Sequence, residues 1–325
     1  MFGTSIARTG IEFGTTSVKL VRGEGRQRLE RVTHALSEPW DGQNREDRLP
    51  RAGAALRDLL RRAGLGRGRL GRIATAVGWQ ESTLREAELP PLTGRELARA
   101  LPFEARNHLD LEAMESPVLA GQILEHTGSA TAESGAGTRV LLAAAPKPRR
   151  DFVIGALECA GLELQVVDLE PLAGLNALFA ELGRDLDPET AVALLDIGAR
   201  HTALHIASRR GGLLTRNVAP GAPAGQAAET SAEQGYFMKL SSGVEQTLTF
   251  YRGRYHREVG AIHAAGGGAR VASRLASLSG AVGFPVKLFL PAASLGAGGL
   301  VAGEPLGPEF LTACGLCRWA DGDHV

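Results

Sequence analysis

A short polar loop near the start of the chain separates two apolar stretches, in "IEFGTTSVKLV" (11–21). Glu12 stands two residues before Gly14, and Lys19 follows inside the next apolar run. Three hydroxyl residues lie between Gly14 and that run: Thr15, Thr16 and Ser17. Glycine lets a backbone approach a ligand closely, hydroxyl and N–H groups donate to phosphate oxygens, and acids organise Mg²⁺ through waters. The loop is a candidate phosphate-binding hairpin, although an ordinary structural hairpin has the same make-up.

The same pattern returns later in the chain, in "ALLDIGARHTALHI" (193–206). Asp196 stands two residues before Gly198, and Thr202 is the hydroxyl residue that follows. In both copies an apolar strand precedes the acid and a hairpin follows the loop. Such internal duplication indicates two related lobes. Two acid–x–Gly hairpins that face each other across a cleft could clamp a polyphosphate together with its Mg²⁺.

A third loop, "AAGGGAR" (264–270), follows a predicted strand and precedes a predicted helix. Its three glycines, Gly266, Gly267 and Gly268, could present backbone N–H groups to the ribose, base or phosphates of a nucleotide. Each of the three loops is weak evidence alone. Their order and matched contexts make the set stronger.

Composition excludes several classes of protein. The 36 Lys and Arg residues balance the 36 Asp and Glu residues, so no global basic field favours nucleic acid. No apolar run reaches the roughly 20 residues of a membrane span, and "MFGTSIARTG" (1–10) lacks the pattern of a signal peptide. We therefore expect a cytoplasmic protein without direct membrane insertion.

The apolar spacing predicts a βββαβ unit in the first 80 residues or so. Its strands are expected at 11–13, 18–23, 28–36 and 72–79. The helix lies within 47–66, with Leu56, Leu59, Leu60 and Ala63 on one face and Gly64 as its C-cap.

A capping box at Thr93–Glu96 opens the next predicted helix, which Pro102 should kink or split. Strands at 116–126 and 139–147 enclose a mobile hairpin tip at 127–138. The remaining predicted elements are helices at 148–161, 171–183, 243–256 and 271–280, and strands at 162–170, 259–265 and 285–289, besides the hairpins of the second lobe at 191–219.

This ordered series resembles the actin-like ATPase superfamily and, within it, the PilM family of type IV pilus assembly. The similarity includes "VLLAAAPKPRRDFVIGALECAGLELQVVDLEPLAGLNAL" (140–178) and "GVEQTLTFYRGRYH" (243–256), which resembles a connecting helix. The resemblance implies an α/β, actin-like bilobed fold with a duplicated ribonuclease H-like core and an inserted subdomain in the first lobe. The expected parts are a first-lobe core (1–90), an inserted subdomain with its return strand (91–150), the end of the first lobe with a connecting helix (151–183), and a second lobe (184–325) with a shortened lid at 221–240.

The resemblance also implies ATP and Mg²⁺ between the lobes. Glu12, Glu170 and Asp196 would position metal-bound waters without ligating the metal directly. Nucleotide contacts would come from Gly14, Thr15, Thr16, Ser17, Lys19, Gly198, Thr202, Gly266, Gly267 and Gly268. Two of the candidate site residues also have purely structural interpretations. Lys19 can face solvent, and Glu170 is an acid of the kind favoured at a helix N-terminus.

The function implied by the resemblance is that of a cytoplasmic scaffold in the assembly of type IV or MSHA-type pili and hence in twitching motility. It would belong to the inner-membrane assembly subcomplex, held at the membrane by the N-terminal tail of a PilN-like protein. An extended tail in a groove is a sound mode of binding, because main-chain pairing and side-chain pockets supply affinity. Nucleic acid is not an expected partner.

Departures from the family pattern leave other functions open. Glu12 replaces the usual Asp, Arg200 replaces a small residue, and 221–240 is shorter than the usual helical lid, as in the related MshI and GspL proteins. Glu233 and Lys239 in that segment echo an acid–lysine pair. We therefore expect at most a weak ATPase. A nucleotide-free, degenerate actin-like adaptor is the main alternative, and an actin-like small-molecule kinase is the other.

Two further patterns favour structure over chemistry. His201 and His205 share one face of a strand but have no third ligand, so a metal site is not expected. Cys314 and Cys317 have redox or zinc spacing, yet no second pair accompanies them. Both cysteines are expected to pack inside a terminal helix.

Overall fold

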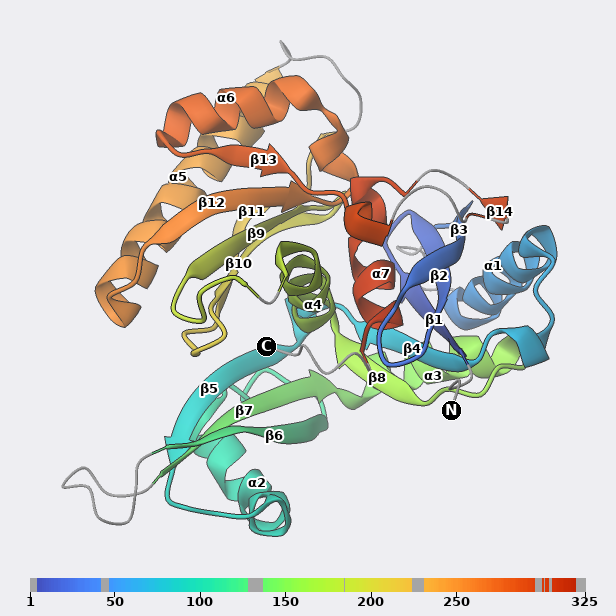
Figure 1. Cartoon of the computed structure of the whole chain (residues 1–325), viewed down its shortest axis with the longest axis horizontal. Coiled ribbons are helices and arrows are strands. Elements are labelled where there is room, and N and C mark those ends of the chain that lie inside the picture. Colours follow the sequence, from blue (N-terminus) through green and yellow to red (C-terminus); the bar gives the residue numbers. More distant parts are fainter. Residues whose placement is uncertain are drawn as a thin grey trace.

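The structure is a computed structural model that describes residues 5–41, 47–127, 137–183, 185–223, 231–295, 300, 302–303 and 306–319. Two sheets form the cores of two lobes, and a third, smaller sheet with one helix projects below them (Figure 1). The mixed α/β class expected from the sequence is confirmed.

The first lobe is built on a sheet with the strand order β14-β3-β2-β1-β4-β8. Its strands are β1 (Ile6–Phe13), β2 (Ser17–Gly25), β3 (Arg31–Pro39), β4 (Arg72–Val77), β8 (Val166–Leu169) and β14 (Ala302–Gly303). Helices α1 (Arg48–Ala63) and α3 (Lys147–Cys159) cover one face. The predicted apolar stripe of α1 is buried, and left-handed Gly64 ends the helix, so both expectations are confirmed.

The second lobe repeats this plan, with the strand order β11-β10-β9-β12-β13. Its elements are β9 (Ala191–Ile197), β10 (His201–Ala207), β11 (Leu214–Pro220), α5 (Ser231–Tyr255), β12 (Val259–Ala265), α6 (Ala272–Val282) and β13 (Val286–Leu288). In each lobe three antiparallel strands are followed by two parallel ones. The duplication inferred from the two loops is thus confirmed.

The sheet of the inserted subdomain has the order β5-β7-β6. Its elements are β5 (Thr83–Leu89), α2 (Gly94–His108), β6 (Pro117–Thr127) and β7 (Gly137–Pro146). The capping box is confirmed, since Thr93 N donates to Glu96 (2.7 Å) and Glu96 N to Thr93 (3.4 Å). The expectation that Pro102 splits the helix is wrong, because α2 continues through it with Leu97 and Ala105 buried. Most of the predicted hairpin tip (128–136) lies outside the described residues.

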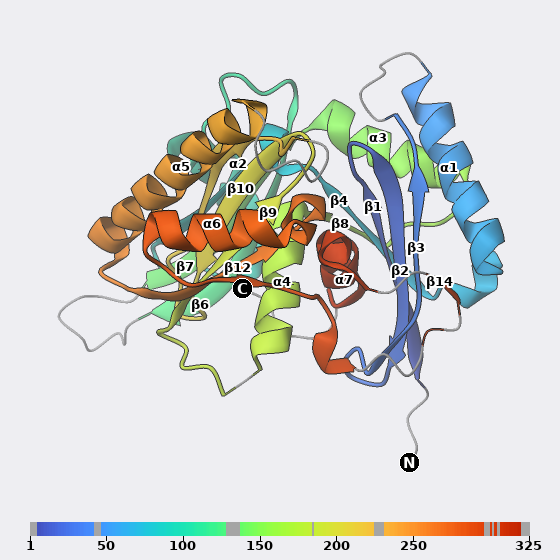
Figure 2. The ribbon, with the colours of Figure 1, turned by 90° about the horizontal axis from the view of Figure 1, so that it is seen from above.

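Two helices occupy the centre of the molecule: α4 (Glu170–Leu182) and α7 (Leu311–Cys317). They lie side by side between the sheets of the two lobes (Figure 2). A Cβ on Gly315 would overlap the carbonyl oxygen of Ala173, so glycine is needed for this close approach. Both predicted packing cysteines are buried here, and burial raises the pKa of Cys317 to about 11. Short 3₁₀ turns complete the fold: η1 (Arg67–Arg69), η2 (Trp79–Glu81), η3 (Gly267–Arg270), η4 (Ala293–Leu295) and η5 (Pro308–Phe310).

Two expectations from the sequence need correction. Strand β5 was not predicted, because its alternation of charged and apolar residues is weak (burial is confined to Ala87 and Leu89). The helix expected at 243–256 starts earlier, at Ser231, so the second half of the presumed lid is the beginning of α5.

Candidate functional site

The first loop joins β1 to β2 and is held from outside by a tryptophan. Gly14 N donates to Ser17 O (3.1 Å), which closes the turn. Trp40 Nε1 donates to Gly14 O (2.9 Å), and Trp40 N donates to Thr16 O (3.0 Å). The indole in turn stacks on Phe152, with ring centroids 6.1 Å apart. Trp40 is not among the residues predicted from the sequence, where its position just after β3 was the available signal.

Lys19 lies opposite Glu12 in the β1–β2 register, and the two side chains form an ion pair of 2.6 Å. Both side chains are largely buried, with 15% and 11% exposed. Burial opposes the charged ammonium, but attraction by Glu12, Asp196 and Glu170 outweighs it and raises the pKa of Lys19. Glu12 Oε2 is buried and has no hydrogen-bond partner among the residues that the structure describes. Lys19 therefore faces the acids of the cleft.

Glu170 begins α4 and accepts a hydrogen bond from Trp79 N (3.0 Å). Burial, followed by the nearby charge of Glu12, raises its pKa to about 7. Burial also raises the pKa of Asp196 at the end of β9. Three carboxylates thus surround one lysine, and a divalent cation would offset their excess negative charge.

The second loop closes in the same way as the first, since Gly198 N donates to His201 O (3.0 Å). His201 and Arg200 line the cleft. Thr202 points the other way because successive side chains of a strand alternate. Its hydroxyl is fully buried in the lobe, 2.9 Å from the hydroxyl of Tyr236. The structure does not bring Thr202 to the cleft.

The third loop lies against Asp196, the acid that precedes the second loop. Gly266 has a positive φ of 83°, and a Cβ there would overlap Asp196 Oδ1. Gly267 faces open space, with no other heavy atom within 4 Å of an added Cβ. Arg274, which is not among the residues predicted from the sequence, fixes the loop by donating to Gly268 O (2.8 Å).

Within the described residues, Glu233 and Lys239 do not form the acid–lysine pair suggested for the lid. Glu233 instead pairs with Arg274 (2.8 Å), whose side chain is 2% exposed. This pair ties the start of α5 to the third loop.

The space between the first and second loops is narrow. It forms a cavity of about 100 Å³ whose lining includes Gly14, Thr15, Glu170, Arg200 and His201. Sites for drug-sized ligands usually enclose roughly 300–1,000 Å³. The residues fit a Mg²⁺-nucleotide in chemistry, but a nucleotide would require the lobes to move apart.

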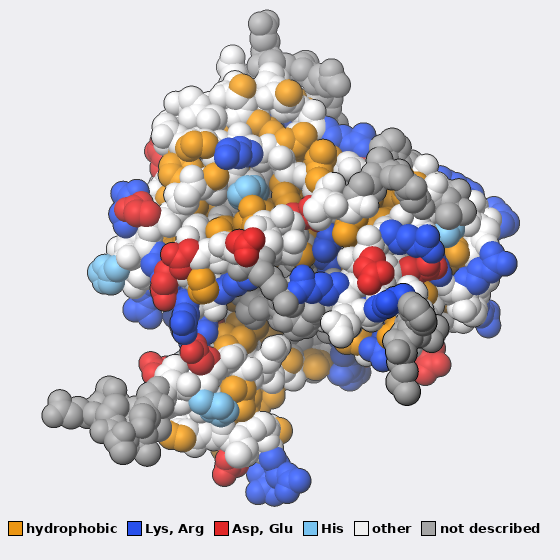
Figure 3. Space-filling view, viewed as in Figure 1, with side chains coloured by type: hydrophobic (Ala, Val, Ile, Leu, Met, Phe, Trp, Pro, Cys, Tyr) orange, Lys and Arg blue, Asp and Glu red, His pale blue; other side chains and the backbone are white. Residues whose placement is uncertain are grey.

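A second hollow, of about 280 Å³, lies between the first lobe and the inserted subdomain. We call it the docking groove. Its floor is one face of β6 and β7, formed by the cross-strand pairs Val118/Ala145, Ala120/Ala143 and Gln122/Leu141. Its wall is β8, the last strand of the first sheet, with Val167, Asp168 and Leu169. The other face of the β6–β7 pair packs on α2. In the space-filling view the subdomain projects from the body, with hydrophobic side chains where it joins (Figure 3).

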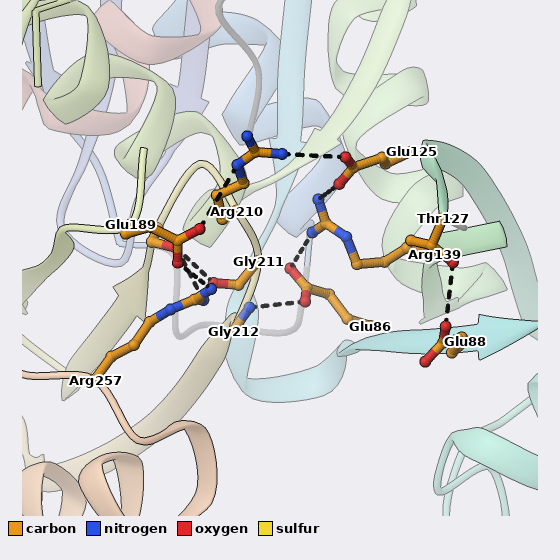
Figure 4. A network of polar contacts seen from close by, with 11 residues as sticks. Glu86, Glu88, Glu125, Thr127, Arg139, Glu189, Arg210, Gly211, Gly212 and Arg257 are labelled. Atoms are coloured by element: carbon orange, nitrogen blue, oxygen red, sulfur yellow. Dashed lines mark hydrogen bonds and ion pairs between the residues drawn. The ribbon is translucent and has the colours of Figure 1, made fainter. Parts of the chain in front are cut away.

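A polar network fastens the inserted subdomain to the second lobe (Figure 4). Arg139 on β7 bridges Glu86 (3.6 Å) and Glu125 (3.0 Å). Glu86 accepts a hydrogen bond from Gly212 N (2.9 Å) in the β10–β11 turn, and Arg210 reaches Glu125 (3.3 Å). The strands that floor the docking groove are thus attached to the opposite lobe.

The comparisons with known proteins agree with this architecture. The family model described as "Type IV pilus assembly protein PilM" matches residues 10–224. No curated protein matches the chain. Among solved structures, the PilM–PilN type IV pilus biogenesis complex is similar at 23% identity, over 95% of this chain and 97% of that one, with a TM-score of 0.76.

Two more distant structures are the ethanolamine utilization protein EutJ from Carboxydothermus hydrogenoformans and the cytoplasmic domain of EpsL from the type II secretion system of Vibrio cholerae. EutJ is 14% identical over 96% of this chain and 89% of its own, with a TM-score of 0.49. The EpsL domain is 11% identical over 95% and 94%, with a TM-score of 0.48. The family match covers most of the chain, and the chain therefore belongs to the PilM family of type IV pilus assembly proteins, with an actin-like fold.

Proposed function

We propose that this protein is a cytoplasmic scaffold of type IV or MSHA-type pilus assembly that binds the N-terminal tail of a PilN-like inner-membrane protein. Family membership and the resemblance to a PilM–PilN complex support a partner of this kind. The observation that carries the proposal is the docking groove, a mostly apolar hollow bordered by β8, which is the last strand of the first sheet in the described part of the chain.

The groove suits an extended peptide. Since β8 is the last strand of its sheet, its outer edge offers main-chain groups that an added strand can pair with. The small side chains of Ala120 and Ala143 on the floor leave room for the alternate side chains of such a peptide. The tail would hold the protein at the cytoplasmic face of the inner membrane. Among the described residues no helix has the length and apolar character to span a bilayer.

The groove can be tested with a bulky charge. Ala120 is exposed in the groove, and we expect Ala120→Arg to weaken the binding of a synthetic PilN-like tail peptide at least ~30-fold, about 2 kcal/mol. Ala98→Arg, on an exposed position of α2, is the matched control and should bind like the wild type. Isothermal titration calorimetry measures both. Equal affinity of Ala120→Arg and wild type would refute the assignment of the groove.

We further propose that Mg²⁺-ATP binds between the lobes and biases the angle between them. Gly14, Thr15, Ser17 and Lys19 would contact the phosphates, and the exposed backbone of Gly267 the nucleoside. When bound, the Mg²⁺ would supply positive charge to the cluster of Glu12, Glu170 and Asp196. Because Glu12 is already paired with Lys19, we expect at most weak hydrolysis.

A nucleotide-free adaptor is the second candidate. Two observations favour it: the cavity between the loops is about 100 Å³, and Lys19 serves as a built-in counter-ion for the acids. Both candidates share the docking groove and differ only in the cleft.

A further inference from the structure

Two charged side chains, those of Asp168 and Arg150, line the otherwise mostly apolar docking groove. Asp168 is the middle residue of the β8 wall, between Val167 and Leu169, and is half-buried. In the described part of the chain its carboxylate forms no ion pair and accepts a hydrogen bond from Leu169 N (2.7 Å). Arg150 also lines the groove, but its guanidinium is engaged with Asp151 (2.6 Å). No base among the described residues forms an ion pair with Asp168, although Arg150 lines the same groove.

A carboxylate partly withdrawn from water without a cationic partner lowers stability, and a ligand that brings a cation regains that energy. The acid also sits where an added strand would pair with β8, so an opposing side chain can reach it. A tail that precedes a membrane span on the cytoplasmic side is expected to be rich in Lys and Arg. The chemistry of the groove and the expected charge of its occupant are therefore complementary.

We propose that Asp168 is the specificity-determining residue of the docking groove and binds a Lys or Arg side chain of the partner's tail. The apolar floor takes the hydrophobic side chains of the same segment, and the acid fixes its register. This inference rests on the proposed function of the groove.

The test is a double-mutant cycle with a synthetic peptide of the PilN-like tail and versions in which each Lys or Arg is replaced singly by Gln. We expect Asp168→Asn to weaken binding of the unmodified peptide by about 10-fold or more. For one of the Lys or Arg residues of the peptide, replacement by Gln should weaken binding to the wild type but not weaken binding to Asp168→Asn any further. The loss should shrink at high salt, because screening weakens the pair. Glu163→Gln, an exposed acid close by in the sequence, controls for general electrostatics.

A charge swap makes the result decisive. Asp168→Lys should bind the wild-type peptide poorly, and binding should recover when the coupled base of the peptide is replaced by Glu. If Asp168→Asn binds within twofold of wild type, or no basic residue of the tail couples to it, the inference is wrong. If Ala120→Arg nevertheless loses binding in that case, the groove is still the binding site of the tail and only the role of Asp168 is refuted. A tail that does not bind wild-type protein at all would overturn both.

Discussion

Glu170→Gln is expected to stabilise the protein at pH 8 by up to about 3 kcal/mol and to change its stability little at pH 5 and below. The pKa of Glu170 is about 7 in the folded protein, against an ordinary value of 4.5. The folded state thus holds this proton more tightly than the unfolded chain does. Wild-type stability should fall as the pH rises through this window, because the buried carboxylate must ionise next to Glu12.

Urea unfolding at pH 5 and pH 8 measures this effect. Glutamine keeps an oxygen that can accept the hydrogen bond from Trp79 N and removes the charge. Glu112→Gln, an exposed acid of the inserted subdomain, is the control and should show no such difference between the two pH values. A Glu170→Gln variant that is no more stable than wild type at pH 8 would show that Glu170 is not under electrostatic strain. An acid that destabilises the free protein is what a cation-binding cleft requires.

Arg139→Met is expected to lower the free energy of unfolding by about 2–3 kcal/mol. The substitution leaves Glu86, whose side chain is 12% exposed, and Glu125 without their bridging guanidinium. Methionine keeps most of the apolar part of the arginine side chain, so the loss of stability measures the effect of removing the guanidinium group. The variant should also raise amide hydrogen exchange at Gly211 and Gly212, because the turn that Glu86 holds is loosened.

The free energy of unfolding of the double variant Arg139→Met/Glu86→Gln should fall by less than the sum of the losses in the two single variants, since each substitution removes the partner of the other residue. Arg99→Met, at an exposed position of α2, serves as the control. Additive losses would mean that the contacts drawn in Figure 4 do not act as one network. The network matters for function because the groove floor belongs to strands that Arg139 ties to the second lobe, whereas β8 belongs to the first.

The sequence predicted the duplicated lobes because the loop pattern and the apolar strands around it are local signals. The same pattern could not place Thr202, whose direction depends on the exact register of β10 and the side of the sheet that α5 covers. Nor could it find the pair of Glu233 with Arg274, which are 41 residues apart and meet only in the folded lobe.

The docking groove was also beyond sequence analysis. The sequence predicts a strand at "LELQVVDLE" (162–170), but in the structure strand β8 spans only Val166–Leu169. Its place as the last strand of the first sheet follows from long-range pairing with β4. The other border of the groove belongs to the sheet of the inserted subdomain. The first strand of that sheet, β5, has no clear apolar alternation in the sequence. A groove between two sheets is a property of their packing, which no local pattern encodes.

Calorimetric titration of Mg²⁺-ATP into the purified protein tests most directly whether a nucleotide binds between the lobes, which decides between the two candidate functions. Gly267→Arg adds a long side chain to the third loop, where the nucleoside is proposed to bind, and Gly280→Arg on α6 is the matched control, since both glycines face open space. We expect wild type and Gly280→Arg to bind ATP with equal affinity and Gly267→Arg to lose binding while its melting temperature stays unchanged. No binding by the wild type at millimolar ATP would contradict the proposed nucleotide binding and leave a nucleotide-free adaptor.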